Sequence, residues 1–373
     1  MSRIVFSAFL LLNFYLAKVS ILDLGAANGF NDAMNVYLEA EPTRFTSLKP
    51  LDSLLTLLVA FFKPIADGKD VPLTLFCVVF AGQLVPLYLL VLVESMRSAN
   101  RERFITYPSV WGVTWQLMTI GITLPCYFLT WIWTSPIPAA VSSPEDFAAA
   151  ISIDQVQGAA VTGAWVLGFI LPSLALGIPS PGVISESTQA RLLAFWQAFP
   201  IWTSLAHFVI SALVSALDIV PKASRKKTST KIARFNQMYS YALVPAAAMY
   251  LGVFGLIYAR AGSLTGGLLS ASELAAAAFR PTWPWDNAPV ASFEKGVLTM
   301  LQWDLYMSSA ASWIWVSYMA YVTAGVWGMV RDLGKLVALG FVLGPGGAAL
   351  AVVWGRDVGA IRAATAAGGK KSG

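Results

Sequence analysis

Two carboxyl groups stand out because they lie inside, or at the end of, long apolar runs. Glu94 follows the run that starts at Pro72, and Asp304 lies seven residues into the run that starts at Val297. An ionisable side chain at membrane depth costs roughly 2.5–3.5 kcal/mol on insertion scales, so its presence predicts a function. A buried carboxyl group that keeps its proton can act as a general acid toward an epoxide oxygen or an olefin.

The residues that share a helical face with Asp304 are mainly apolar or aromatic: Met307, Ser308, Ala311, Trp315 and Tyr318. Aromatic faces can stabilise positive charge that develops on carbon. One interpretation is therefore a site in which Asp304 donates a proton and the aromatic rings shield a carbocation. In the other interpretation Asp304 bonds to a neighbouring helix and the tryptophans are interfacial anchors. The residues alone leave both open.

Glu94 lies eleven residues after Gln83, which is about three helical turns, so both side chains are expected on one face. Arg97 is three residues further on and within reach of a salt bridge to Glu94. One interpretation is a carboxyl group at the mouth of an apolar cavity, tuned by Arg97 and by burial. The other is an ordinary ion pair at the end of a helix.

The remaining polar residues predict neither a metal site nor a cofactor site. His207 is the only histidine, and with Asp218 it is interpreted as polar packing on one helical face. Cys77 and Cys126 lie in separate apolar runs, which predicts buried free thiols. The sequence contains no P-loop, GxSxG, HExxH or DDxxD motif. Aromatic and basic residues are not interleaved, so we expect no nucleic-acid partner.

The elements that position these residues are predicted to be membrane-spanning helices. The chain of 373 residues is 57% hydrophobic and 12% charged, whereas soluble domains are about 45–50% apolar and about 25% charged. Runs of about 20 apolar residues are long enough to cross a bilayer as helices. We therefore predict an all-α, polytopic integral membrane protein. Eight or nine transmembrane helices would form a bundle with a central cavity, helped by proline kinks.

The predicted spans are residues 4–22, 72–93, 110–133, 156–178, 192–217, 238–258, 297–326 and 336–354, and the run 51–65 is a ninth candidate of short length. Residues 1–22 are interpreted as a first helix or signal anchor that is retained rather than cleaved. The polar stretch 23–45 is expected to be a loop. All 373 residues are assigned to one transmembrane domain.

Basic residues in short loops predict the orientation of the chain. The basic loop 219–236 is placed in the cytosol, and helix parity then puts the loop around Glu145 and residues 331–335 on the same side. The long loop 263–296 falls in the lumen. Parity also puts the arginines of segment 95–104 in the lumen, which conflicts with the rule. Residues 356–373 are expected to be a polar tail, and its final KKSG resembles an endoplasmic-reticulum retrieval signal that requires a cytosolic C-terminus.

Several patterns carry a family resemblance: the E-S-x-R-x-x-N cluster at Glu94, Ser95, Arg97 and Asn100, Gln116 in a tryptophan-containing helix, and the pair Trp303 and Asp304. With these patterns, most of the chain resembles the fungal membrane-bound terpene cyclases of ascofuranone and ascochlorin biosynthesis. The same family includes enzymes assigned as epoxide hydrolases in polyketide pathways such as those of aurovertin and citreoviridin.

The resemblance implies acid-initiated cyclisation of a lipophilic prenylated substrate by an isomerase or lyase type of enzyme that uses no metal or cofactor. Asp304 or Glu94 would be the catalytic acid, and Arg97 and Asn100 would orient Glu94. The other candidate substrate-binding residues are Gln83, Gln116, Trp303, Trp315 and Tyr318.

Two alternatives remain: an epoxide hydrolase acting on a polyketide epoxide, and a non-enzymatic small-molecule carrier. The expected partners are the lipophilic substrate and membrane lipid, in the endoplasmic reticulum. The oligomeric state is not predicted.

Overall fold

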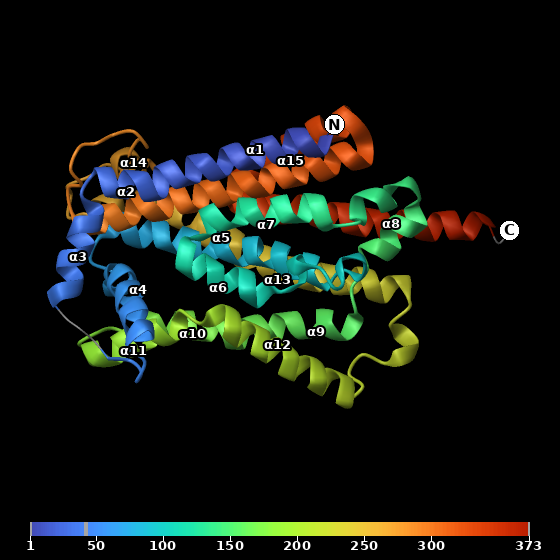
Figure 1. The fold of residues 1–373 in the computed structure, drawn as a ribbon, viewed down its shortest axis with the longest axis horizontal. Coiled ribbons are helices and arrows are strands. Elements are labelled where there is room, and N and C mark those ends of the chain that lie inside the picture. The colour runs from blue at the N-terminus through green and yellow to red at the C-terminus, as the bar shows by residue number, and fades with distance from the viewer. Residues whose placement is uncertain (1, 41–43, 372–373) are drawn as a thin grey trace.

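The computed structural model describes residues 2–40 and 44–371, and most of these residues are helical (Figure 1). Within the described ranges no strand is assigned, and β-type pairing is limited to one bridge between Arg97 and Ile153. The prediction of an all-α chain is confirmed.

Among the described residues, six helices are long and apolar enough to cross a membrane. They are Ser2–Ala27 (α1 Ser2–Ala17, the π-turn Lys18–Asp23 and α2 Leu24–Ala27), α5 (Val71–Met96), Gln155–Leu176 (α9 Gln155–Trp165, the π-turn Val166–Ile170 and α10 Leu171–Leu176), α12 (Phe199–Ala216), α13 (Thr228–Leu264) and part of α15 (Phe293–Lys371). Their length and composition indicate association with a membrane.

Shorter helices connect or cap these six. They are α3 (Phe30–Ala40), α4 (Lys49–Asp67), α6 (Pro108–Met118), α7 (Ile120–Thr134), α8 (Pro144–Ala150), α11 (Glu186–Trp196) and α14 (Ala271–Phe279), with 3-10 turns at Ser98–Asn100, Phe104–Thr106, Ile137–Ser142 and Lys222–Ser224. In Figure 1, α3, α4 and α11 lie at the end of the molecule away from both chain termini.

Helix α5 is the centre of the bundle and packs against α13 and α15, while α7 packs against α1 and α15. Of the six long helices, α5 is the most buried, and it is apolar around its whole circumference. A helix that is hydrophobic on every side is stable only when other elements surround it. Gln83 and Glu94, both fully enclosed, therefore depend on the neighbouring helices for their hydrogen-bond partners.

The predicted span 110–133 is wrong because the chain turns back inside it. Thr119 has φ 66° and ψ 154°, which ends α6 and allows α7 to start in a new direction. The two short helices pack against each other as a hairpin. An apolar run of suitable length does not reveal such a turn, because the residues on both sides of it are equally hydrophobic.

The predicted span 336–354 is wrong for a similar reason. Backbone that is not helical interrupts α15 at Ala324–Gly325 and again at Gly344, leaving helical segments 293–323, 326–343 and 345–371. Residues 331–335 face both 316–323 and 352–356 around one cavity, so consecutive segments run antiparallel. Segments 326–343 and 345–371 thus form a second hairpin, whose tip, Gly344, is buried against Gln83 near the middle of α5.

These two hairpins account for the difference from the predicted helix count. Eight or nine spans are not confirmed: six helices qualify by length and composition among the described residues. Several boundaries also differ from the predictions. The expected loop 23–45 contains α3, and the basic loop 219–236 ends where α13 starts at Thr228. The long loop 263–296 contains α14, which buries Leu274 and Ala278.

Residues 356–371 continue α15 instead of forming a polar tail, and the KKSG pattern extends beyond the described residues. Asp218 follows the end of α12, so it does not share a helical face with His207 as predicted.

The hairpins also change which segments lie at the same end of the bundle. Arg97 contacts Ile151 and Asp357, and Thr228 contacts Thr365. These contacts bring together the arginine-rich segment 97–103, the loop before α9, the basic loop before α13 and the C-terminal segment. Figure 1 shows both chain termini at this end. The parity conflict in the sequence therefore disappears, because 110–133 enters and leaves the bundle at one end.

Candidate active site

Four charged side chains form a buried ion network where α5 meets the last segment of α15. Arg97 contacts Glu94 at 2.7 Å (Nε–Oε1) and Asp357 at 2.8 Å (Nη2–Oδ2). Arg356 lies 2.8 Å from Asp357 Oδ1 and 3.4 Å from Glu94 Oε1. Two carboxylates therefore balance two guanidinium groups, which is the condition under which burial of such charges is tolerated.

Arg97 holds this network together from the C-cap of α5. Its side chain is fully buried, and Nη1 donates to the carbonyl oxygen of Ile151 at 2.9 Å. Burial by itself would lower the pKa of Arg97, but the carboxylates of Asp357 and Glu94 raise it well above its ordinary value. The guanidinium is therefore charged, and the predicted ion pair between Glu94 and Arg97 is present.

Neutral side chains complete the hydrogen bonding of both carboxylates. Trp131 Nε1 donates to Glu94 Oε2 at 2.9 Å, and Asn100 Nδ2 donates to the same oxygen at 3.4 Å and to the Glu94 backbone carbonyl oxygen at 2.8 Å. Tyr239 Oη donates to Asp357 Oδ2 at 2.5 Å. Each donor comes from a different part of the chain, so the network depends on the packing of α5, α7, α13 and α15.

Aromatic rings adjoin this network on the side of α7. Trp131 packs edge-on against Trp315 with ring centroids 5.3 Å apart, and Phe128 stacks on Trp315 at 4.9 Å. Arg356 lies over the Trp315 ring, 5.7 Å from its centroid, and Tyr318 packs edge-on against Trp131. The predicted aromatic residues Trp315 and Tyr318 thus pack on Trp131, which bonds to Glu94. They lie about three and four helical turns along α15 from Asp304.

Asp304 lies apart from the ion network and contacts the tip of the α6–α7 hairpin. It is buried, and its Oδ1 accepts the backbone N–H of Gly121 at 2.5 Å. This N–H belongs to the first turn of α7, where it has no partner within its own helix. A Cβ at position 121 would lie 2.9 Å from Oδ1, so the close approach requires glycine. Within residues 2–40 and 44–371, Asp304 forms no ion pair. Asp304 therefore bonds to a neighbouring helix, as one of the two interpretations of the sequence predicts. Its catalytic role stays a prediction.

The glutamines and Trp303 have distinct surroundings. Gln83 holds the Gly344 turn: Nε2 donates to the carbonyl oxygen of Leu343 at 3.0 Å, and Oε1 accepts from the N–H groups of Gly346 and Gly347 at 3.0 and 3.1 Å. Trp303 Nε1 donates to the carbonyl oxygen of Thr282 at 2.9 Å. Gln116 Nε2 is buried without a hydrogen-bond partner in the described part of the chain.

Sequence reasoning missed Arg356, Asp357, Tyr239 and Trp131. Arg356 and Asp357 were assigned to a polar tail, although they follow an apolar run as Glu94 and Arg97 do. That shared pattern could have identified Arg356 and Asp357 as site residues, because a second charged pair at the end of an apolar run can neutralise the first pair, Glu94 and Arg97. Tyr239 and Trp131 gave no signal, since tyrosine and tryptophan are common throughout apolar helices.

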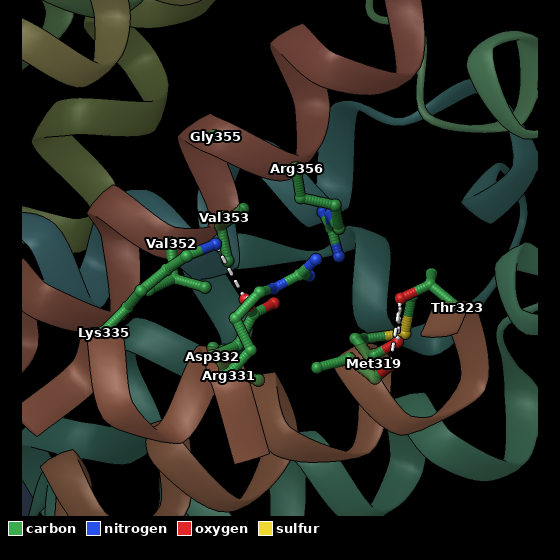
Figure 2. A pocket seen from close by; sticks show the side chains of 11 residues that line it. Met319, Thr323, Arg331, Asp332, Lys335, Val352, Val353, Gly355 and Arg356 are labelled. Carbon is green, nitrogen blue, oxygen red and sulfur yellow. Dashed lines mark hydrogen bonds and ion pairs between the residues drawn. The ribbon is translucent and has the colours of Figure 1, made fainter. Parts of the chain in front are cut away.

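One cavity borders the ion network at Arg356 (Figure 2). Its volume is about 260 Å³, and its polar lining is Thr323, Arg331, Asp332, Lys335 and Arg356. A second hollow, of about 440 Å³, has a mainly apolar lining that includes Leu75, Val78 and Met249 between α5 and α13. Neither is lined by Asp304 or Glu94.

No group of three or more His, Cys, Asp or Glu side chains among the described residues is arranged to hold a metal ion. Cys77 and Cys126 are free thiols, as predicted, but both are half-buried rather than buried.

Comparison with known proteins relates this arrangement to one family. A model of the CtvD domain matches residues 7–361. Terpene cyclase ascI of Acremonium egyptiacum is 30% identical over 90% of this chain and 83% of its own length. Terpene cyclase ctvD of Aspergillus terreus is 26% identical over 93% of this chain and 97% of its own length, and terpene cyclase penA of Penicillium crustosum is 26% identical over 89% and 88%. No solved structure matches the chain.

Proposed function

The chain belongs to the CtvD domain family, and from this premise we propose that it is a membrane-bound terpene cyclase of fungal secondary metabolism. Its substrate would be a lipophilic prenylated molecule, and the reaction would start with protonation of an epoxide or an olefin. The similarity to proteins named terpene cyclases, which extends over nearly the whole chain, supports the enzyme class.

The observation that carries the chemical part of the proposal is Asp304. A general acid must hold a proton and release it to the substrate, so a buried carboxyl group without a cationic partner suits this task. Glu94 is paired with two guanidinium groups, whereas Asp304 accepts the backbone N–H of Gly121 and has no cationic partner among the described residues. Its Oδ2 is the atom that would carry the transferable proton. We therefore favour Asp304 as the acid and keep Glu94 as the second candidate.

The proposed reaction proceeds through a carbocation. Proton transfer from Asp304 to an epoxide oxygen breaks the C–O bond and leaves positive charge on carbon. An olefin of the same substrate donates its π electrons to that carbon and closes a ring. Aromatic faces would stabilise the displaced charge. The final cation returns a proton to the carboxylate of Asp304, which restores the acid and completes the product.

We further propose that residues 1–373 form one membrane-spanning domain in the endoplasmic reticulum. Helix α1 would be a retained part of it, because Phe6 packs on Tyr318 and Ser7 accepts a hydrogen bond from Trp133. The end of the bundle that carries the arginine-rich segment 97–103 and the basic loop before α13 is called its basic end. This end would face the cytosol, in accordance with the positive-inside rule.

The test is turnover of an epoxyfarnesyl-aryl substrate by microsomes that contain the full chain, in water labelled with ¹⁸O. A cyclase that closes its ring with a substrate olefin or hydroxyl group gives a product without label. Stoichiometric label in a new hydroxyl group would replace this proposal with an epoxide hydrolase. If the substrate crosses proteoliposome membranes unchanged and is not converted, the alternative of a non-enzymatic carrier is correct.

Because no metal is required by the proposed step, we expect turnover to be unchanged by EDTA.

A further inference from the structure

The cavity beside Arg356 has an unusual balance of charge. Arg331 Nε and Lys335 Nζ both contact Oδ1 of Asp332, at 2.9 and 2.8 Å. Asp332 is the only carboxyl group among the residues that line the cavity, whereas Arg331, Lys335 and Arg356 are all cationic. One carboxylate therefore faces three positive charges.

The two guanidinium groups point toward each other across this cavity, as Figure 2 shows. Arg356 has two carboxylate partners, Asp357 and Glu94, and both lie on the side of the ion network. The Nη1 atom of Arg356 is buried and has no hydrogen-bond partner in the described part of the chain. A buried charged donor without an acceptor is costly, and converging like charges repel. Both costs would be removed by an anion placed between Arg331 and Arg356.

We propose that this cavity binds the phosphate group of an anionic ligand. Guanidinium groups present paired N–H donors that match phosphate oxygens, and an ammonium group adds a point charge. The volume of about 260 Å³ accommodates a phosphate group with several waters, since one water occupies about 30 Å³ in the liquid. The phosphate is either free in solution or the headgroup of an anionic phospholipid.

The position of the cavity suits both sources. Arg331 and Lys335 expose 60% and 51% of their side chains, whereas Arg356 exposes 12%. The cations thus lead from the surface to the interior at the basic end of the bundle. Basic pockets between helices at such an end are typical sites for acidic lipid headgroups. A bound phosphate would also fix Arg356 against the Glu94–Asp357 network. The site itself does not depend on the proposed cyclase reaction.

The experiment is native mass spectrometry of the full chain purified in detergent, with phosphatidic acid, phosphatidylcholine or inorganic phosphate added separately. We expect one molecule of phosphatidic acid to bind in preference to phosphatidylcholine. Arg331→Gln is expected to weaken this binding about ten-fold, which corresponds to the loss of one charge-assisted hydrogen bond. Arg362→Gln, which removes an exposed arginine of α15 that does not line the cavity, is the matched control.

A second variant tests the cavity without changing its charge. Gly355 lines the cavity, and a Cβ there meets nothing within 4 Å, so Gly355→Leu is expected to obstruct it and weaken binding. If the unaltered chain binds inorganic phosphate and both variants lose this binding, free phosphate is sufficient as the ligand. Binding of phosphatidic acid alone would identify the lipid headgroup. The proposal is overturned if Arg331→Gln and Gly355→Leu bind both anionic probes as tightly as the unaltered chain.

Discussion

At the scale of single residues, Asp304 and Glu94 separate two tasks that a carboxyl group can perform. Glu94 is neutralised by Arg97 and Arg356, whereas Asp304 bonds to the backbone N–H of Gly121 and to no cation in the described part of the chain. An ion-paired carboxylate stabilises the arrangement around it, while an unpaired buried one is better suited to exchange a proton. This difference decides which substitution tests catalysis and which tests stability.

Asp304→Asn is expected to lower turnover by the 10²–10⁴-fold typical of a lost general acid while the chain still folds. The asparagine carbonyl oxygen can accept the Gly121 N–H as Oδ1 does now, but an amide has no acidic proton to donate. Turnover would be measured with purified protein in detergent. Asp218→Asn, at an exposed carboxyl group outside α12, is the control. If Asp304→Asn keeps more than about a tenth of the original rate, Asp304 only joins two helices and Glu94 becomes the candidate acid.

Arg97→Met is expected to destabilise the chain by about 3–5 kcal/mol, because it leaves the buried carboxylates of Glu94 and Asp357 with one guanidinium instead of two. The measurement is the thermal unfolding midpoint in detergent. Arg101→Met, a few residues away at an exposed position, should change stability by less than about 0.5 kcal/mol. Equal midpoints for the two variants would show that the ion network contributes no net stability.

At the scale of elements, the hairpin at Gly344 carries the second half of the ion network. Gly344 has φ 73° and ψ 169°, a conformation almost restricted to glycine. Gln83 on α5 bonds to the backbone on both sides of this turn. The position of Arg356 and Asp357 therefore depends on a turn about three helical turns before them.

Gly344→Ala is expected to lower both the unfolding midpoint and turnover. The backbone conformation costs about 1–3 kcal/mol for a residue with a side chain, and the new Cβ would overlap the Gln83 amide. Gly334→Ala is the matched control, since a Cβ there meets nothing within 4 Å in a helical backbone, and alanine is the better helix former. If both variants unfold at the same temperature, Gln83 does not fix this turn.

At the scale of the whole molecule, six long helices and two hairpins bring the basic segments to one end of the bundle. Arg97, Ile151 and Asp357 are in direct contact there. Helix α14 belongs to the loop between α13 and α15 that was predicted to be lumenal, and it lies at the opposite end in Figure 1. The positive-inside rule then predicts one orientation, with the basic end in the cytosol.

This orientation can be checked with single cysteines in sealed microsomes. We expect Ala223→Cys and Arg101→Cys to react with a maleimide that does not cross membranes, and Ser272→Cys to react only after detergent is added. All three positions are exposed, and the unaltered chain corrects for labelling of Cys77 and Cys126. Labelling of Ala223→Cys but not Arg101→Cys in intact microsomes would mean that residues 110–133 cross the membrane once, as their hydrophobicity alone predicts.

The sequence by itself determined the helical class and identified the individual residues that could take part in chemistry. Long apolar runs predict helices without tertiary information, because each helix satisfies its own backbone hydrogen bonds. The same physics makes Glu94 and Asp304 conspicuous, since a carboxyl group in an apolar run is rare and costly. The pair Glu94 and Arg97 was also accessible, because it is set by helical spacing within a few residues.

Only the tertiary structure decided where the chain turns and which charges meet. The turns at Thr119 and Gly344 occur inside apolar runs, where hydrophobicity does not change, and they are fixed by contacts with Asp304 and Gln83 on other helices. Asp357 lies 260 residues from Arg97 along the chain, so no local pattern links them. The network depends on the packing of helices that are distant in sequence, and such packing is determined by the whole set of side chains in the bundle.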